Sequence, residues 1–280
     1  MTTPNGTIKI SDINTEFSLG NDLINYHGVK YYKPATMSIG TFSSTTLNMS
    51  DFRGTQSKVT VNITISSDTQ NYTLNTGLVS GYVAGFTTVN LTINNGIYVG
   101  SSSTGTYALT ITGFTSGDTV NLINNGVIIG AGGNGGSGHS NAAGDAGSPG
   151  GNALLLQCPV NITNNGTIAG GGGGGGAADG GHTYGSCFGG GSDYTGSGGG
   201  GGAGYNPGSG GSGDTGGSSG TRTSGGAAGS GQGNPGNGGN PGVDGQASTN
   251  GRAGGSAGKY ITGQGYANWV VTGTRLGYAS

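Results

Sequence analysis

The side chains that could perform acid–base, nucleophilic or metal chemistry are few and widely spaced in this sequence. None of the three histidines lies in the HExxH pattern of a zinc hydrolase, and the two cysteines, Cys158 and Cys187, form no CxxC pair. Six acidic residues stand without the second carboxylate that glycoside hydrolysis uses, namely Glu16, Asp145, Asp179, Asp193, Asp214 and Asp244. We therefore expect no catalytic residue, no metal site, no cofactor and no enzyme.

Phosphate-binding and membrane signals are also missing. GxGxxG matches are numerous, but none lies between a strand and a helix, and the single Gly-Lys pair is followed by Tyr260 instead of Ser or Thr. The 9 basic residues are scattered and the net charge is −2, so nucleic-acid binding is not expected. No apolar run approaches the roughly 20 residues of a membrane span, so we expect no membrane insertion.

Glycine dominates the composition, with 70 glycines among 280 residues. Only 30% of the residues are apolar and 7% charged, whereas an ordinary globular domain is nearly half apolar and about a quarter charged. Ile, Leu, Val and Phe are concentrated in the first 170 positions. A conventional hydrophobic core is therefore expected in the first part of the chain only.

Residues 1–57 are predicted to form a first, adaptor-like module. Asp12 is of a type that caps a helix or begins a turn, and a short helix is expected near 11–16. Short strands or turns are expected to follow around the aromatic anchors Tyr31 and Tyr32. The module thus mixes a little helix with irregular structure.

Residues 58–129 are predicted to form a β-strand domain. The stretch KVTVNITI at 58–65 alternates apolar and polar residues, which is the pattern of a half-buried strand. After a glycine-rich domain at 130–258, strand-forming residues return at 259–280, where we expect a closing strand.

One motif occurs three times: VNLTINNGIYVG at 89–100, VNLINNGVIIG at 120–130 and VNITNNGTIAG at 160–170. Asn-Gly is the pair that favours a type I′ turn. Each copy is therefore predicted to form either a tight hairpin or one coil of a stacked β element, in which the next copy buries its apolar face.

The glycine-rich domain has a three-residue period, which a flexible linker does not need. Glycine leads six of the seven triplets at 132–152 and seven of the eight at 233–256. Such a period fits an extended helix with three residues per turn, whose backbone groups need partners from outside the helix. With 7 prolines a collagen triple helix is excluded, so we predict several short glycine helices that pack side by side.

The interruptions of the glycine period are predicted to form turns at the ends of this bundle. A rigid bundle with bulky groups at its tips would display those groups to a partner, although they could also simply cap the bundle. The predicted partner-binding residues are His139, His182, Tyr184, Phe188, Tyr194, Tyr205 and Arg222.

The glycine-rich stretch with aromatic tips resembles the distal tail-fibre adhesins of tailed bacteriophages. The segment SGDTVNLINNGVIIGAGG resembles the lead-in to their glycine domain, and GTIKISDINTEFSLGNDLINYHGVKYYKP resembles the opening of tail-tip proteins that attach to the tail. The resemblance implies a mostly β fold with irregular parts: an N-terminal attachment module, a β-rich middle domain and a C-terminal bundle of packed polyglycine-II helices. The implied tail-attachment residues are Ile10, Asp12, Phe17, Tyr31 and Tyr32.

The resemblance also implies the biological role. The chain is expected to be a receptor-binding protein of the distal virion tail, made in the host cytoplasm, that binds a bacterial surface protein or saccharide and contacts other tail proteins. A homotrimer is left open, because no heptad repeat marks one. Two alternatives stand beside the adhesin: a structural tail-tip or baseplate protein without a receptor of its own, and an ice-binding protein.

Overall fold

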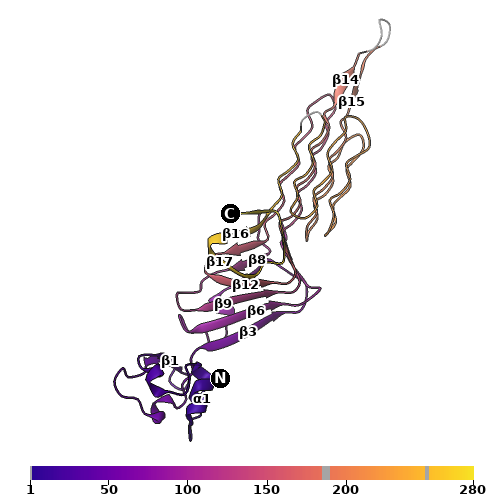
Figure 1. Cartoon of the computed structure of the whole chain (residues 1–280). Coiled ribbons are helices and arrows are strands. Elements are labelled where there is room, and N and C mark those ends of the chain that lie inside the picture. The colour runs from indigo at the N-terminus through magenta and orange to yellow at the C-terminus, as the bar shows by residue number, and fades with distance from the viewer. Residues whose placement is uncertain (1, 185–189, 250–251) are drawn as a thin grey trace. The chain divides into compact units, whose positions relative to one another are not determined.

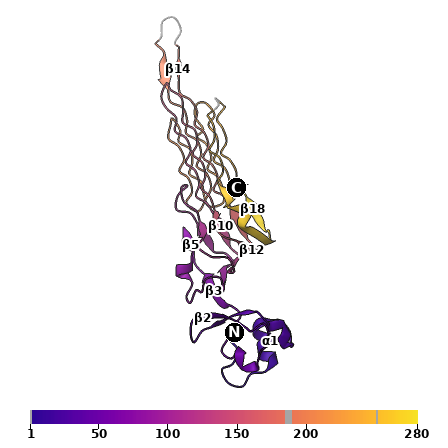
Figure 2. The same ribbon diagram turned by 90° about the vertical axis from the view of Figure 1, so that its left-hand side faces the viewer.

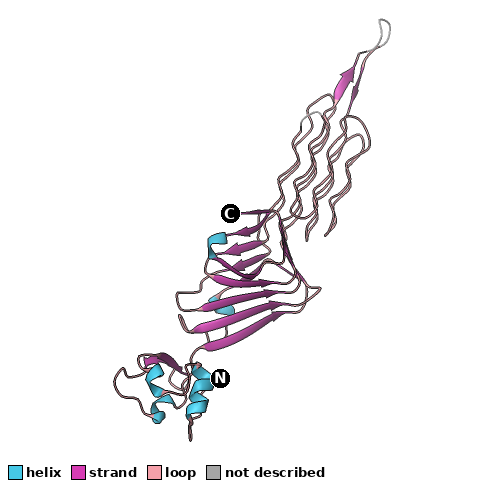
Figure 3. Ribbon diagram, viewed as in Figure 1, coloured by secondary structure: helices cyan, strands magenta, loops and turns pink. Residues whose placement is uncertain are grey.

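A computed structural model of the chain describes residues 2–184, 190–249 and 252–280, and it is mostly β with few helices, as expected (Figures 1 and 3). The chain divides into two compact units. The first contains residues 1–62, 76–90 and 114–119, and the second contains residues 63–75, 91–113 and 120–280.

The N-terminal part of the first unit is small and packs around aromatic rings. Its elements are α1 (Ile10–Phe17), η1 (Leu23–Tyr26), the antiparallel pair β1 (Lys30–Lys33) and β2 (Ser38–Thr41), and η2 (Met49–Phe52). The helix near 11–16 is thus confirmed, and Asp12 accepts a hydrogen bond from the Lys9 amide at its first turn. The core consists of Ile13 and the aromatic residues Phe17, Tyr26, Phe42 and Phe52. The four aromatic rings pack edge to face or tilted against one another.

The predicted attachment residues differ in their access to a partner. Phe17 and Tyr32 are each only 8% exposed, so these two side chains stabilise the unit and offer no surface for docking. Ile10, Asp12 and Tyr31 are half-buried. The aromatic residue type alone did not show which of these side chains are buried in the core and which are accessible to a partner.

Beyond residue 58 most strands form three parallel five-stranded sheets, and the chain visits the sheets in turn. The first sheet contains β3 (Val59–Ile65), β6 (Thr87–Ile93), β9 (Thr119–Asn124), β12 (Val160–Asn164) and β17 (Ala267–Val271). The second sheet contains β4 (Thr69–Gln70), β7 (Tyr98–Gly100), β10 (Val127–Ile129), β13 (Thr167–Ala169) and β18 (Thr274–Leu276). The third contains β5 (Tyr72–Leu74), β8 (Leu109–Ile111), β11 (Leu154–Leu156), β16 (Lys259–Thr262) and β19 (Tyr278–Ala279). Each circuit of the three sheets is one coil of a parallel β-solenoid.

The threefold repeat marks the corner between the first and second sheets. In each copy the first strand ends at or just before the Asn-Asn pair, and the next strand begins after the glycine. Equivalent strands pair in parallel, so the copies are stacked coils and the hairpin alternative is wrong. Leu91, Leu122 and Ile162 are fully buried, because alternate residues of each strand point into the solenoid.

Two predicted domain boundaries need correction. The segment 154–169, placed within the glycine-rich domain, instead forms β11, β12 and β13 of the sheets. The closing segment 259–280 contains four short strands, β16 to β19, in place of one. The reason in both cases is that a solenoid coil needs one strand per sheet, and each strand is only a few residues long.

The corner also contains buried asparagines. Asn164 is 0% exposed; its amide nitrogen donates to the carbonyl oxygens of Thr272 and Thr274, and its side-chain oxygen accepts from Asn124. We expect Asn164→Ala to lower the free energy of unfolding by about 3 kcal/mol, because it removes three hydrogen bonds of a fully buried side chain, each worth roughly 1 kcal/mol net. Urea unfolding measures this, with Asn165→Ala as the control, since the side chain of Asn165 is exposed and donates to the exposed side of the neighbouring coil at Asn125. An equal effect of both substitutions would contradict the role of burial.

The glycine-rich stretches leave the solenoid at the corner between the second and third sheets. Residues 130–153 connect β10 to β11, and residues 170–258 connect β13 to β16. In the other coils this corner is short. Both stretches run as extended segments side by side, drawn as loops in Figure 3 and seen from a second side in Figure 2.

Backbone hydrogen bonds join these segments with a three-residue period. The amides of Gly133 and Gly136 donate to the carbonyl oxygens of Gly172 and Gly175, at 2.9 Å each. On the next segment the pattern continues, with bonds from Gly172 to Ala203, from Gly175 to Gly200 and from Ala178 to Ser197. Residues 170–178 are buried throughout, so this core consists of backbone with almost no side chains.

Candidate functional site

The end of the glycine segments furthest from the sheets carries an antiparallel hairpin, β14 (Gly181–Thr183) and β15 (Ser192–Tyr194) (Figures 1 and 2). His182 lies opposite Asp193, and their side chains are paired at 2.6 Å between Nδ1 and Oδ1. The ring of His182 meets the ring of Tyr184 edge to face, 5.1 Å apart. Tyr184 is 91% exposed, so the hairpin presents an aromatic surface to solvent.

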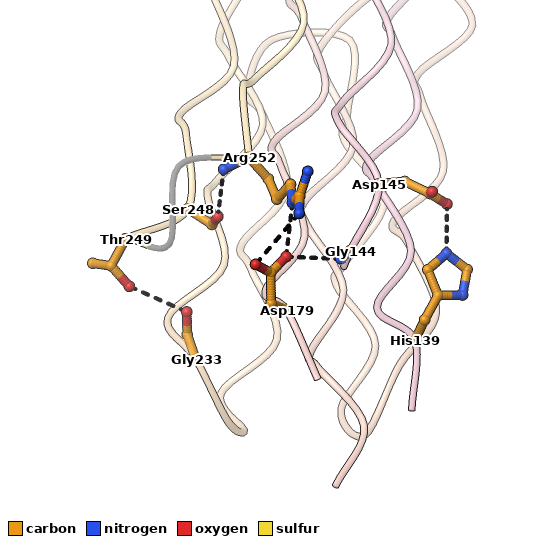
Figure 4. Close-up of polar contacts among 8 residues, drawn as sticks. All are labelled: His139, Gly144, Asp145, Asp179, Gly233, Ser248, Thr249 and Arg252. Carbon is orange, nitrogen blue, oxygen red and sulfur yellow. Dashed lines mark hydrogen bonds and ion pairs between the residues drawn. The ribbon is translucent and has the colours of Figure 1, made fainter. Parts of the chain in front are cut away.

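A second loop lies beside this hairpin. Ser140 forms an isolated antiparallel bridge with Thr195, and the amide of Gly196 donates to the carbonyl oxygen of His139. The Nε2 atom of His139 is 3.1 Å from the carboxylate of Asp145 (Figure 4). Both side chains of this pair are about half exposed to solvent. The structure therefore brings His139, His182, Tyr184 and Tyr194 to one end of the molecule's second unit.

An arginine–aspartate pair ties the loops of this end together. Arg252 donates through Nε to Asp179 at 2.7 Å, and the amide of Gly144 donates to the same carboxylate at 2.8 Å (Figure 4). These bonds, chiefly the one from Arg252, lower the pKa of Asp179 below its ordinary value. Because the folded pKa is lowered, the contact is complete above the ordinary aspartate pKa of about 3.9 and is lost as pH falls through the folded value.

Several acids that stand alone in the sequence have partners in the structure. Asp145 and Asp193 pair with histidines, Asp179 pairs with Arg252, and Asp244 accepts a bond from the Tyr278 hydroxyl. These partners are histidine, arginine and tyrosine side chains, which the sequence alone did not identify. No signal in the sequence could have found the Asp179–Arg252 pair, because the two residues are 73 positions apart and meet only when the segments pack.

Two of the predicted tip residues do not lie at this end. The amide of Tyr205 donates to the carbonyl oxygen of Gly130, which directly follows β10, and Arg222 pairs with Asp68 next to β4. Both side chains therefore lie where the glycine segments meet the second sheet. Glycine interruptions form turns at both ends of the segments, and the sequence could not say which turn lies at which end. Phe188, the remaining predicted tip residue, lies outside the described residues.

The described residues contain no group of three or more His, Cys, Asp or Glu side chains that could hold a metal ion. Within the same residues, no helix has the length and apolar character needed to cross a membrane. What the distal end offers is thus an exposed aromatic ring, two histidine–carboxylate pairs and a set of tight loops.

Comparisons with known proteins agree on one family. A family model described as phage tail fibre adhesin Gp38 matches residues 60–280. The fold is similar to a chain in the crystal structure of the gp37–gp38 adhesin tip complex of the bacteriophage S16 long tail fiber. That similarity has a TM-score of 0.56 and 25% sequence identity, and it covers 85% of this chain and 89% of the other. No curated protein matches the sequence significantly.

Proposed function

This chain belongs to the phage tail fibre adhesin Gp38 family, and we propose that, as a receptor-binding adhesin of the virion tail, it meets the bacterial surface through the distal end of its glycine segments. The observation that carries this placement is the β14–β15 hairpin, where Tyr184 is almost fully exposed beside the His182–Asp193 pair. Aromatic side chains with a polar neighbour are the groups that contribute most to binding at interfaces. Tyr194 and His139 flank this surface.

We propose further that the glycine segments are packed polyglycine-II helices. Three observations support this: glycine recurs every third residue, the inter-segment hydrogen bonds recur with the same period, and the central segment is buried. A dense array of backbone hydrogen bonds, each worth roughly 1 kcal/mol net, offsets the entropy that glycine loses on ordering. Such a bundle would hold the hairpin stiffly away from the sheets.

The first unit is proposed to attach the chain to another tail protein. The family model begins at residue 60, so the N-terminal module stands outside it. This module exposes large apolar side chains, with Ile24 65%, Ile39 47% and Met37 82% exposed. The related S16 structure is named as a complex of two tail-fibre proteins, which is consistent with such a partner.

Competition for adsorption tests the proposed function. Host cells incubated with the purified full chain should adsorb the phage at least tenfold more slowly than untreated cells, because the chain occupies the receptor. Bovine serum albumin at the same concentration is the control. Unchanged adsorption at saturating concentrations of the folded chain would instead favour a structural tail protein without its own receptor.

A further inference from the structure

Arg222 is surrounded by three fixed side chains at the end of the glycine segments that meets the second sheet. Its guanidinium lies over two aromatic rings, 4.4 Å from the centroid of Tyr205 and 5.0 Å from that of Tyr98. Its Nη1 atom donates to Asp68 at 2.9 Å. The three partners come from three different parts of the second unit: Asp68 precedes β4, Tyr98 begins β7, and Tyr205 lies within the glycine segments.

Each partner of Arg222 is itself fixed. The second oxygen of the Asp68 carboxylate accepts a bond from the Tyr98 amide at 2.9 Å, and this bond is the main cause of the lowered pKa of Asp68. The ring of Tyr205 lies against Gly100, where a Cβ atom would come within 1.9 Å of it. The neighbouring Asn206 donates to the carbonyl oxygen of Ser102 at 2.9 Å.

We propose that Arg222, Asp68, Tyr98 and Tyr205 form a clamp that fixes the orientation of the glycine segments on the solenoid. Arginine suits this place because its flat guanidinium stacks on aromatic faces and donates to a carboxylate at the same time. A lysine would keep the charge but lose the stacking. Arg222 is thus a positioning residue for the distal end and makes no contact with the receptor; this consequence for adsorption rests on the proposed function.

The geometry also argues against a receptor-binding role for this pair. Arg222 has its planar face and one nitrogen engaged within the chain, and Tyr205 has its ring against Gly100 and Arg222. Both lie at the opposite end of the glycine segments from the β14–β15 hairpin. A receptor that binds the hairpin would have no need to reach them.

Hydrogen exchange tests the clamp without reference to any receptor. In the full chain, Arg222→Gln should speed exchange of the Gly204 and Tyr205 amides at least tenfold, because Gly204 bonds to Thr221, next to Arg222, and Tyr205 bonds to Gly130 at the end of β10. The Gly175 and Ala178 amides, in the middle of the bundle and towards its far end, should be unaffected. Arg222→Lys should give an intermediate rate. Arg275→Gln is the matched control, since Arg275 also stacks on two aromatic rings, but these belong to Tyr260 and Trp269 of the sheets.

Two further results separate the clamp from the proposed function. Tyr205→Leu should speed the same amides, and combining it with Arg222→Gln should add little, because both changes open one clamp. Arg222→Gln should weaken adsorption competition equally towards every host strain that the phage infects, since presentation changes while the contact surface does not. Unchanged exchange at Gly204 and Tyr205 would overturn the clamp, and so would a loss of competition confined to one strain. If the unaltered chain fails to compete at all, the proposed function fails while the exchange result still decides the clamp.

Discussion

Gly174→Ala is expected to disrupt the packing of the glycine segments strongly. A Cβ atom on Gly174 would lie 1.9 Å from the carbonyl oxygen of Asn134, and the segment is buried, so it has no free side to move towards. The Gly174 amide also donates to Ser148 at 2.9 Å and its carbonyl accepts from Gly255 at 2.8 Å, so a shift breaks several bonds. We expect a loss of about 3 kcal/mol in the free energy of unfolding, the upper part of the range for overpacked sites.

Urea unfolding of the full chain, followed by hydrogen exchange across 170–178, measures this effect. Gly216→Ala is the control, because Gly216 is exposed and the nearest atom to an added Cβ is 3.4 Å away. The control should change stability by less than about 0.5 kcal/mol, as surface substitutions usually do. If both variants unfold alike, the segments are not packed backbone to backbone and the rigid bundle is refuted.

The largest expected effect on binding comes from the hairpin. We expect the double substitution Tyr184→Ala and His182→Ala to reduce adsorption competition about thirtyfold or more, which corresponds to the loss of at least 2 kcal/mol that marks a binding hot spot. The fold should persist, because Tyr184 is almost fully exposed and His182 is exposed on the hairpin, where its ion pair is with Asp193 of the facing strand. The half-maximal concentration of purified chain in the competition assay measures the change.

Tyr266→Ala controls for the loss of an exposed tyrosine. Tyr266 is 47% exposed and lies in η4 (Gln264–Tyr266), between strands of the third and first sheets. Its removal should leave competition unchanged. Full competition by the hairpin variant, at unchanged thermal stability, would show that the receptor contacts another part of the chain.

Local pattern predicted the parts of this molecule that depend on nearest neighbours in the sequence. The alternation of Val59, Val61, Ile63 and Ile65 marks a strand, and Asp12 marks the start of a helix, because both signals act within one element. The repeated Asn-Asn-Gly marks a corner that the structure uses three times. The three-residue glycine period likewise corresponds to the spacing of the hydrogen bonds between segments.

The sequence by itself thus determined that the chain has a strand-rich part, glycine segments with a three-residue period, and turns that carry the bulky side chains. These features follow from the residue period and the turn-forming residues, which are local properties of the sequence. Only the tertiary structure decided which turn lies at which end. It placed His182 and Tyr184 on the exposed hairpin, and it placed Tyr205 and Arg222 beside each other where the glycine segments meet the second sheet. It also paired Asp179 with Arg252, and it showed that residues 154–169 form strands of the solenoid. These outcomes depend on the stacking order of coils and segments, which joins residues that are tens to more than a hundred positions apart and leaves no mark in any short stretch of sequence.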